Sequence, residues 1–315
     1  MIDVGLHLYR IGIIGDGIQS ARIQKILTKL NKKFYIYKPN GDENYYDNKK
    51  FQILRNCKII FIISPNKTHY KYIKLLAKGR YIFCEKPPTS NKAELKKLQK
   101  YNSGNIYFNF NFRFSILCEI LKTCKKYDFG KLMGGNIITS HGLAFKEEYQ
   151  KNWRSNKKLN PLGVLEMVLI HYIDMINFHF DLSKPMNINL NNFSKKGTSY
   201  DTCSLSFKCD KAVINFFATY GAPLCHKIFL LFQNGYIEQT SNNLEIRGPR
   251  MRFNKKGQFI KPRLIKSYKI NHIKDFNLSL IKSVKYFLSI SLKNKKFDKK
   301  FFEKSIISNK LILNF

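Results

Sequence analysis

The feature that most constrains the fold is the stretch IGIIGDGIQSAR, residues 11–22. A mostly apolar run, residues 11–14, reaches Gly15 and Gly17, and apolar residues then recur at helical spacing. This pattern predicts a buried strand that turns tightly into a helix. There the glycines let backbone N–H groups approach a phosphate, and the helix start offers its unpaired donors. Because Ser20 takes the third place of G-x-G-x-x-G, the loop alone also fits an ordinary strand-to-helix turn.

Length and composition indicate a folded globular protein with two domains. The chain has 315 residues, of which 44% are hydrophobic, enough to give each domain a core. Its seven cysteines never form a C-x-x-C pair, so we expect neither a disulfide framework nor a metal site. The first ten residues include Asp3 and no long apolar core, and apolar runs such as residues 59–63 are too short for a bilayer. We therefore expect a cytoplasmic protein with no membrane span.

The formal net charge of +35 invites a nucleic-acid interpretation. The lysines, however, are spread through nearly every segment, whereas a dedicated nucleic-acid-binding protein concentrates its charge on one face. The densest basic runs, residues 255–266 and 293–300, fit a solvated surface. We therefore expect non-specific attraction to polyanions at low salt and no specific nucleic-acid partner.

Strand and helix patterns alternate after the glycine loop. Residues 33–37 predict a second strand that ends at a turn, Lys38-Pro39-Asn40, and residues 58–64 and 81–84 predict two more, with a helix at 70–78 between them. This order predicts a parallel sheet with helices on its faces. Ligands of such sheets bind at the carboxyl ends of the strands, where Gly15, Lys38, Ser64 and Lys86 lie.

Lys38 lies close to the position, about 20 residues after the glycines, whose side chain reads the ribose of a dinucleotide. An acid there accepts hydrogen bonds from the ribose hydroxyls, whereas a lysine can neutralise a 2′-phosphate. The residue therefore favours NADP slightly over NAD, the alternative being one more surface lysine.

Three segments together resemble the dinucleotide-binding half of the Gfo/Idh/MocA family, that of glucose-fructose oxidoreductase and inositol dehydrogenase. They are GIIGDGIQSA at residues 12–21, SPNKTH at 64–69 and LLAKGRYIFCEKP at 75–87. The family pattern has a T/S-P-N-x-x-H strand end, followed by an A-L-x-A-G-K-H-V-x-C-E-K-P run. Three matches in this order are far more specific than the glycine loop alone.

The second half resembles the family more loosely. NFRF at 111–114 is similar to its N-x-R-F strand, Trp153-Arg154 to its W-R pair, and GVLEMVLIHYID at 163–174 to its helix G-x-L-L-D-x-G-x-H-x-x-D. Later patterns predict an antiparallel sheet with one solvated face, a hairpin at Asn234-Gly235 and closing helices; they lie at residues 202–207, 213–219, 227–232, 236–239, 278–292 and 301–313.

The expected fold is therefore α/β, in two domains. Residues 1–115 would form a Rossmann-type dinucleotide-binding domain. Residues 116–315 would form an α+β domain for substrate binding and oligomerisation, with a mostly antiparallel, open-faced sheet. In the family this open face often supports dimers or tetramers, so a homo-oligomer is expected.

The resemblance implies an NAD(P)-dependent oxidoreductase that transfers a hydride between the nicotinamide and a hydroxyl-bearing carbon of a sugar, cyclitol or nucleotide-activated sugar. Lys86 would hydrogen-bond the reacting hydroxyl, His171 would take or return its proton, and Asp174 could orient the imidazole. The residues implied for the cofactor are Gly15, Asp16, Gly17, Ile18, Gln19, Lys38, Ser64, Pro65, Asn66, His69, Glu85 and Lys86. Those implied for the substrate are Arg113, Trp153, Arg154 and Tyr172.

One position departs from the family pattern. The family acid lies four residues before the histidine, where this chain has Met167, and Glu166 is one residue early. A regular helix would turn Glu166 away from the face of His171. The alternatives are a local shift of the backbone, service by another carboxylate such as Asp174, or loss of dehydrogenase chemistry. A catalytically silent nucleotide-binding or scaffold protein is the second hypothesis, and a polyanion-binding protein is a weaker third.

Overall fold

The computed structural model describes residues 10–39, 48–101, 103–250 and 253–314, and the chain divides into two compact units. Unit 1 comprises Met1–Phe110 and Ile281–Leu313, and unit 2 comprises Asn111–Leu280 with residues 314–315. The expected second domain, 116–315, included the segment 281–313, which here clusters with unit 1. Residues 1–9 and Asn40, which entered the expectations on a leader peptide and on a turn, lie outside the described residues.

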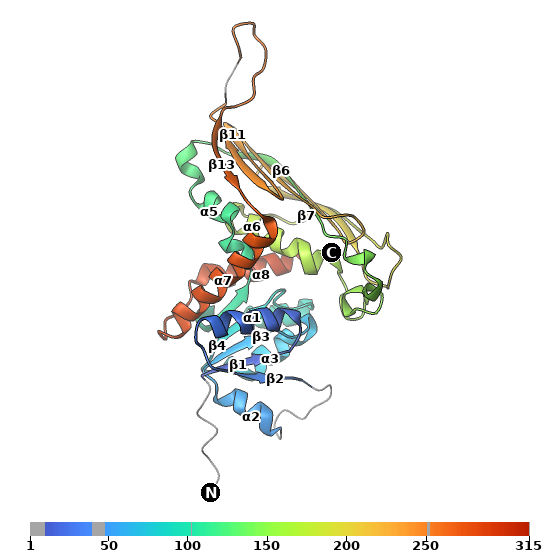
Figure 1. The fold of residues 1–315 in the computed structure, drawn as a ribbon, viewed down its shortest axis with the longest axis vertical. Coiled ribbons are helices and arrows are strands. Elements are labelled where there is room, and N and C mark those ends of the chain that lie inside the picture. The colour runs from blue at the N-terminus through green and yellow to red at the C-terminus, as the bar shows by residue number, and fades with distance from the viewer. Residues whose placement is uncertain (1–9, 40–47, 102, 251–252, 315) are drawn as a thin grey trace. The chain divides into compact units, whose positions relative to one another are not determined.

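Unit 1 is built on a five-stranded parallel sheet (Figure 1) with the order β2-β1-β3-β4-β5. Strands β1, β3, β4 and β5 are buried along their whole length, as continuous apolar runs covered on both faces should be. The predicted Rossmann-type sheet is confirmed. The strands are β1 (Ile11–Ile14), β2 (Phe34–Tyr37), β3 (Ile59–Ile62), β4 (Tyr81–Glu85) and β5 (Ile106–Asn109).

Helices from both ends of the chain complete unit 1. Phe287, in the second half of α7, packs its ring against Phe61 of β3 and Phe83 of β4, with centroids 5.2 and 5.3 Å apart. This aromatic packing explains why the C-terminal segment belongs to unit 1. The helices are α1 (Ile18–Lys29), α2 (Lys49–Asn56), α3 (His69–Leu76), α4 (Lys92–Leu98), α8 (Lys299–Leu313) and the end of α7 (His272–Ser291).

Unit 2 is built on an eight-stranded sheet with the order β13-β12-β11-β10-β6-β9-β8-β7 (Figure 1). Only the β6–β9 pair is parallel among these paired strands, and burial alternates along β9, so one face is solvated as predicted. The hairpin at Asn234-Gly235 joins β10 to β11. The strands are β6 (Leu132–Ser140), β7 (Pro185–Asn191), β8 (Thr202–Cys209), β9 (Ala212–Thr219), β10 (Cys225–Phe232), β11 (Gly235–Thr240), β12 (Asn243–Arg247) and β13 (Leu264–Lys269).

The helical part of unit 2 consists of α5 (Ile116–Lys122), α6 (Ile170–Phe180) and the start of α7. A π-helical turn, Leu165–Leu169, leads directly into α6. Across the described ranges, none of the helices combines the length and the apolar character needed to traverse a bilayer. Nor does this part of the chain bring three or more His, Cys, Asp or Glu side chains together in a way that could hold a metal.

Candidate functional site

The candidate cofactor site is the carboxyl edge of the parallel sheet of unit 1. All five strands run in the same direction, so the residues that follow them gather at one edge. The strand order reverses its direction between β1 and β3, and sheets of this kind bind ligands in the crevice at that point. The loop after β1 is the glycine loop.

The glycine loop is shaped for close approach of its backbone. Gly15 has a φ of +107°, and a Cβ there would lie 2.2 Å from the carbonyl oxygen of Ile63, so only glycine fits. A Cβ on Gly17 would meet nothing within 4 Å, which leaves open space before α1. Gly17 is the N-cap of α1 and provides no side-chain cap for the first-turn N–H groups. The loop therefore fits the pyrophosphate of a dinucleotide.

Ser20 shows why the third glycine of the motif is dispensable here. Its buried hydroxyl donates to the carbonyl oxygen of Gly15 at 2.7 Å, and Gln24 Nε2 donates to Ser20 Oγ at 3.0 Å. The serine therefore ties α1 back to the loop that precedes it. The sequence analysis recorded Ser20 only as a departure and missed this positioning role.

The carboxylate of Glu85 connects three elements of the edge. Glu85 ends β4, and its Oε1 accepts from Gln19 Nε2 of α1 at 3.0 Å and from Asn109 Nδ2 of β5 at 2.7 Å. Burial raises the pKa of Glu85, and the two amide donors and the neighbouring Lys86 oppose that shift. Lys86 is itself buried. Asn109 escaped the sequence analysis because a single Asn at a strand end carries no motif.

His69 connects two of the expected cofactor loops, the one after β3 and the one after β4. Its Nδ1 lies 2.7 Å from the carbonyl oxygen of Pro87, and its Nε2 lies 2.9 Å from that of Ser64. The ring is fully buried, and burial lowers its pKa. The loop that follows β3 is fastened further by Ser64 Oγ, 2.6 Å from Thr68 Oγ1. His69 thus positions the loops around Pro65, Asn66 and Lys86 from inside the protein.

Two predicted residues on neighbouring loops form an ion pair. Lys38 Nζ, after β2, lies 3.4 Å from Asp16 Oδ2, after β1, and both side chains are largely exposed. Next to them Ile18 begins α1 with 74% of its surface exposed, an apolar side chain open to a ligand. The structure therefore brings the residues that could read the adenosine end of a cofactor to the mouth of the glycine loop.

The π-helical turn explains the displaced acid of unit 2. The N–H of Ile170 donates to the carbonyl oxygen of Leu165, five residues earlier, as in a π-helix. Glu166 and His171 are also five residues apart, so the turn brings them to the same side of the helix, where a regular helix would separate them. The backbone is therefore locally shifted, one of the three alternatives left open by the sequence. Glu166 is fully buried, and its Oε1 accepts from the N–H of Leu162 at 3.0 Å.

Two predicted residues of unit 2 prove to be partners of each other. Arg113 donates from Nε and Nη2 to both carboxylate oxygens of Asp174, at 2.8 and 2.6 Å, and its guanidinium lies over the ring of Phe178. Both side chains are only 1% exposed. This buried pair gives Arg113 a structural role in holding α6 in unit 2, and its expected substrate contact stays a prediction. Asp174 was expected to orient His171, but both oxygens of its carboxylate already accept hydrogen bonds from Arg113.

The remaining predicted residues of unit 2 lie in different surroundings. His171 is half-buried with its ring 5.0 Å from that of Phe112, and Trp153 is half-buried with Arg154 stacked 4.6 Å above it. Tyr172 is buried, and its hydroxyl lies 3.3 Å from His226 Nδ1 under the sheet. Tyr172 thus contacts the core of unit 2, and its assignment to substrate binding stays a prediction.

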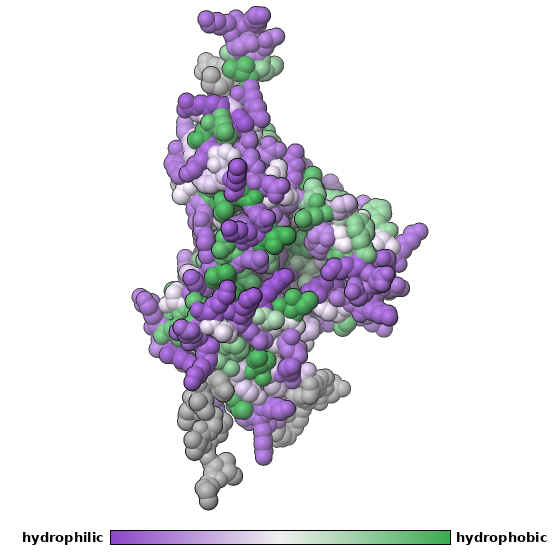
Figure 2. Space-filling view, in the orientation of Figure 1, coloured by the Kyte–Doolittle hydropathy of each residue, from purple (hydrophilic) through white to green (hydrophobic). Residues whose placement is uncertain are grey.

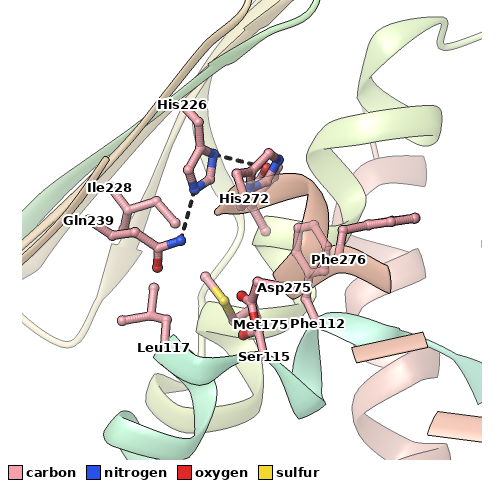
Figure 3. Close-up of a pocket in the computed structure, with 11 residues that line it drawn as sticks. Phe112, Ser115, Leu117, Met175, His226, Ile228, Gln239, His272, Asp275 and Phe276 are labelled. Atoms are coloured by element: carbon pink, nitrogen blue, oxygen red, sulfur yellow. Dashed lines mark hydrogen bonds between the residues drawn. The ribbon is translucent and has the colours of Figure 1, made fainter. Parts of the chain in front are cut away.

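A small cavity with both apolar and polar lining lies in unit 2, between β10, β11, α6 and the start of α7 (Figure 3). His226 stacks on His272 with ring centroids 3.9 Å apart, and its Nε2 lies 3.1 Å from Gln239 Nε2. Gln239 Oε1 is buried without a hydrogen-bond partner among the described residues. The enclosed space is about 10 Å³, room for a single water molecule that would satisfy this oxygen.

Comparison with known proteins agrees with this geometry. Residues 19–105 match the family model named for Gfo, Idh and MocA and described as "Oxidoreductase family, NAD-binding Rossmann fold". Residues 19–105 of this chain thus belong to the Gfo/Idh/MocA oxidoreductase family. The suspected membership is confirmed over this range, which includes two of the three segments that carried the resemblance, residues 64–69 and 75–87.

Relatives extend the likeness to unit 2. Levoglucosan dehydrogenase, solved with NADH and levoglucosan, is 16% identical with a TM-score of 0.73 over 97% of this chain and 96% of its own. A putative NADPH-dependent oxidoreductase from Desulfitobacterium hafniense is 14% identical with a TM-score of 0.73 over 96% of this chain and 93% of its own. These similarities show that both units share the fold of these oxidoreductases.

A sequence relative among characterised proteins is D-glucoside 3-dehydrogenase from Escherichia coli K12. It is 24% identical over 165 residues, which are 50% of this chain and 46% of the relative. The chain therefore spans about half the length of the curated relative that it matches.

Because His226 is buried as a neutral ring, unit 2 should lose stability in acid. Burial and the neighbouring His272 lower the pKa of His226 from 6.5 to about 3. Between these values the unfolded chain binds a proton that the folded chain does not, so stability falls as the pH falls. We expect His226 to account for roughly 3–5 kcal/mol of this loss.

Urea unfolding of the wild type and of His226→Gln, measured from pH 8 to pH 4, checks this expectation. The measurement at pH 8 isolates the packing cost of the substitution, since His226 is neutral there in both states. The variant should show a shallower decline with pH. Parallel declines in the two proteins would contradict the role of His226.

Proposed function

We propose that the chain is an NAD(P)-dependent oxidoreductase of carbohydrate metabolism, acting on a hydroxyl-bearing carbon of a sugar, cyclitol or nucleotide-activated sugar. The observation that carries the proposal is the carboxyl edge of unit 1, where an open glycine loop, Glu85 and Lys86 follow strands of one parallel sheet. The names of the dehydrogenases above support a sugar-like substrate. We place the enzyme in the cytoplasm, where its seven free cysteines stay reduced.

The cofactor is assigned to residues of unit 1. The backbone of Gly15, Asp16 and Gly17 and the start of α1 would bind the pyrophosphate, with Ile18 against the ligand. Glu85 and Lys86 would bind the nicotinamide end. The loop Ser64-Pro65-Asn66, which His69 holds in place, would line one side of the cofactor site. When bound, the nicotinamide supplies the acceptor or donor of the hydride.

Lys38 supports a preference for NADP. Its ammonium lies at the end of β2, and its present ion-pair partner is the exposed carboxylate of Asp16. A 2′-phosphate carries more charge than this carboxylate and would take Lys38 as its partner, whereas Asp16 would repel it. The two residues therefore act in opposite directions on the choice between NAD and NADP.

Fluorescence titration with NADH and NADPH measures this choice. We expect Lys38→Ala to weaken NADPH binding about tenfold and NADH binding much less, and Asp16→Asn to strengthen NADPH binding several-fold. Lys67→Ala, an exposed lysine on the loop after β3, is the matched control. Equal losses for both cofactors in Lys38→Ala would show that Lys38 does not read the 2′-phosphate, and no binding of either cofactor would refute the proposed function.

The proton chemistry is assigned by the family resemblance, residue by residue. The proton of the reacting hydroxyl leaves as its carbon gives up a hydride, so the site needs a base and a cation that steadies the developing alkoxide. His171 would be the base and Lys86 the cation. We assign the acid that supports His171 to Glu166, which the π-helical turn brings to the histidine side. Trp153 and Arg154, stacked and half-buried, are the proposed substrate contacts in unit 2.

Steady-state kinetics with a panel of sugars and cyclitols tests these roles. We expect His171→Ala and Lys86→Ala to lower kcat about 10²- to 10⁴-fold, and Glu166→Gln to lower it less, with cofactor affinity retained in His171→Ala and Glu166→Gln. Met167→Leu is the control, because it keeps an apolar side chain at the position of the family acid. Unchanged biological activity in His171→Ala and Lys86→Ala would instead support a silent nucleotide-binding protein.

A homo-oligomer is proposed on the solvated face of the large sheet. This face exposes Ile138, Phe217 and Leu231 from the adjacent strands β6, β9 and β10. Ile138 and Phe217, with Asn, Ser and other apolar residues, line a shallow hollow of about 360 Å³. Sedimentation velocity should show a species larger than the monomer, and Phe217→Asp should shift it toward the monomer. A wild-type protein that sediments as a monomer at micromolar concentration would contradict this assignment.

A further inference from the structure

The structure carries one surface feature that the proposed enzyme does not use. Between β12 and β13, the described residues 248–250 and 253–263 project beyond the large sheet (Figure 1). We call the sequence 248–263 the basic arm, because it contains six Lys and Arg and no Asp or Glu. The acid-free stretch continues on both sides, from residue 246 to residue 274.

The tip of the basic arm is fixed by its own hydrogen bonds. The N–H of Asn254 donates to the carbonyl oxygen of Gln258 at 3.0 Å, and the side-chain oxygen of Asn254 accepts from the N–H groups of Lys256 and Gln258. Gly257 closes the turn with a φ of +73°. The tip therefore holds one shape before any partner binds, which lowers the entropy cost of binding.

Two phenylalanines face each other across this tip. Phe253 and Phe259 form an antiparallel bridge, with ring centroids 5.1 Å apart. They are 54% and 88% exposed, so the pair forms an apolar knob that the described chain leaves open to water. The exposed lysines Lys255 and Lys256 lie in the turn beyond the knob. Figure 2 shows hydrophobic surface adjoining strongly hydrophilic surface on this arm, at the top of the view.

The basic arm differs from the other dense basic run of the chain. Residues 293–300 include Asp298, and their phenylalanine, Phe297, is buried with only 4% exposed. That run is a solvated surface, as the sequence predicts. Of these two basic runs, only the arm joins exposed aromatic side chains to acid-free positive charge.

We propose that the basic arm docks this protein on an anionic phospholipid bilayer, with the Phe253–Phe259 knob in the interface and the lysines against the headgroups. Basic residues and exposed apolar side chains are the two signals that together hold a protein at such a surface. A second copy of this chain is a poorer occupant of the arm, because the arm carries six Lys and Arg without an acid and a copy with a net charge of +35 offers it few acids. Single-stranded nucleic acid, whose bases could also stack on exposed rings, is the alternative occupant that the experiment below distinguishes from lipid.

The exposed aliphatic side chains of the adjoining strand also favour lipid. Leu264 and Ile265 begin β13, the edge strand of the sheet, and both are exposed directly after the arm. Aliphatic side chains gain from a hydrocarbon environment but offer no ring to a nucleotide base. The start of β13 therefore adds exposed aliphatic side chains directly after the basic arm.

Vesicle co-sedimentation of the full chain tests the proposal. The probes are vesicles of phosphatidylcholine alone and of phosphatidylcholine with about one third phosphatidylserine, in about 0.1 M salt. We expect binding to the anionic vesicles and at least about tenfold weaker binding to the neutral ones. Phe253→Ser/Phe259→Ser and Lys255→Gln/Lys256→Gln should each weaken binding about tenfold or more. Phe193→Ser removes a side chain that is 70% exposed elsewhere in unit 2 and should bind like the wild type.

A spectroscopic variant separates insertion from simple charge attraction. Phe259→Trp adds a second tryptophan to a chain that contains only Trp153, so the difference from the parent spectrum reports the arm. Its emission should shift to shorter wavelength with anionic vesicles and stay unchanged with a single-stranded oligonucleotide. Vesicle binding that survives both arm variants would overturn the proposal. Arm variants that change only oligonucleotide binding, or only the sedimentation coefficient, would assign the arm to nucleic acid or to a second copy.

Discussion

The buried carboxylate of Glu85 is the interaction on which the candidate site most depends. One of its oxygens accepts from the first turn of α1 and from the end of β5, so a single acceptor fixes the glycine-loop helix relative to the last strand of the sheet. Burial raises the pKa of Glu85 and so favours the neutral acid, and the amide donors and Lys86 oppose that shift. Lys86 is therefore next to a carboxyl group whose position is fixed by hydrogen bonds, at the point where chemistry is proposed.

The remaining constraints of the edge are steric and act through the backbone. Gly15 must lack a side chain because a Cβ there would collide with the carbonyl oxygen of Ile63, and the Ser20 hydroxyl donates a hydrogen bond to the same loop. The buried ring of His69 connects the loops after β3 and β4 through contacts with their backbone carbonyl oxygens. Together these contacts leave the open space in front of Gly17 as the place where a phosphate can meet backbone donors.

Much of this fold could be predicted from the sequence, since continuous apolar runs mark the parallel strands and the Asn234-Gly235 pair marks a hairpin. The packing of the C-terminal segment on unit 1 could not be predicted, because Phe287 contacts Phe83 across some 200 residues. Apolar periodicity shows which face of a helix is buried but not which element it packs against. Ion-pair partners are equally invisible, as Arg113 and Asp174 show. The position of Glu166 on the same side of the helix as His171 could not be predicted, because sequence spacing assumes 3.6 residues per turn. Only the backbone shows the π-helical turn.

The central claim is that the carboxyl edge of unit 1 binds a nicotinamide dinucleotide. A crystal structure of the chain with NADPH tests it most directly. The account predicts the pyrophosphate on the backbone N–H groups of residues 15–18, the 2′-phosphate beside Lys38 and the nicotinamide beside Glu85 and Lys86. A dinucleotide bound elsewhere, or a glycine loop left empty at saturating NADPH, would contradict it.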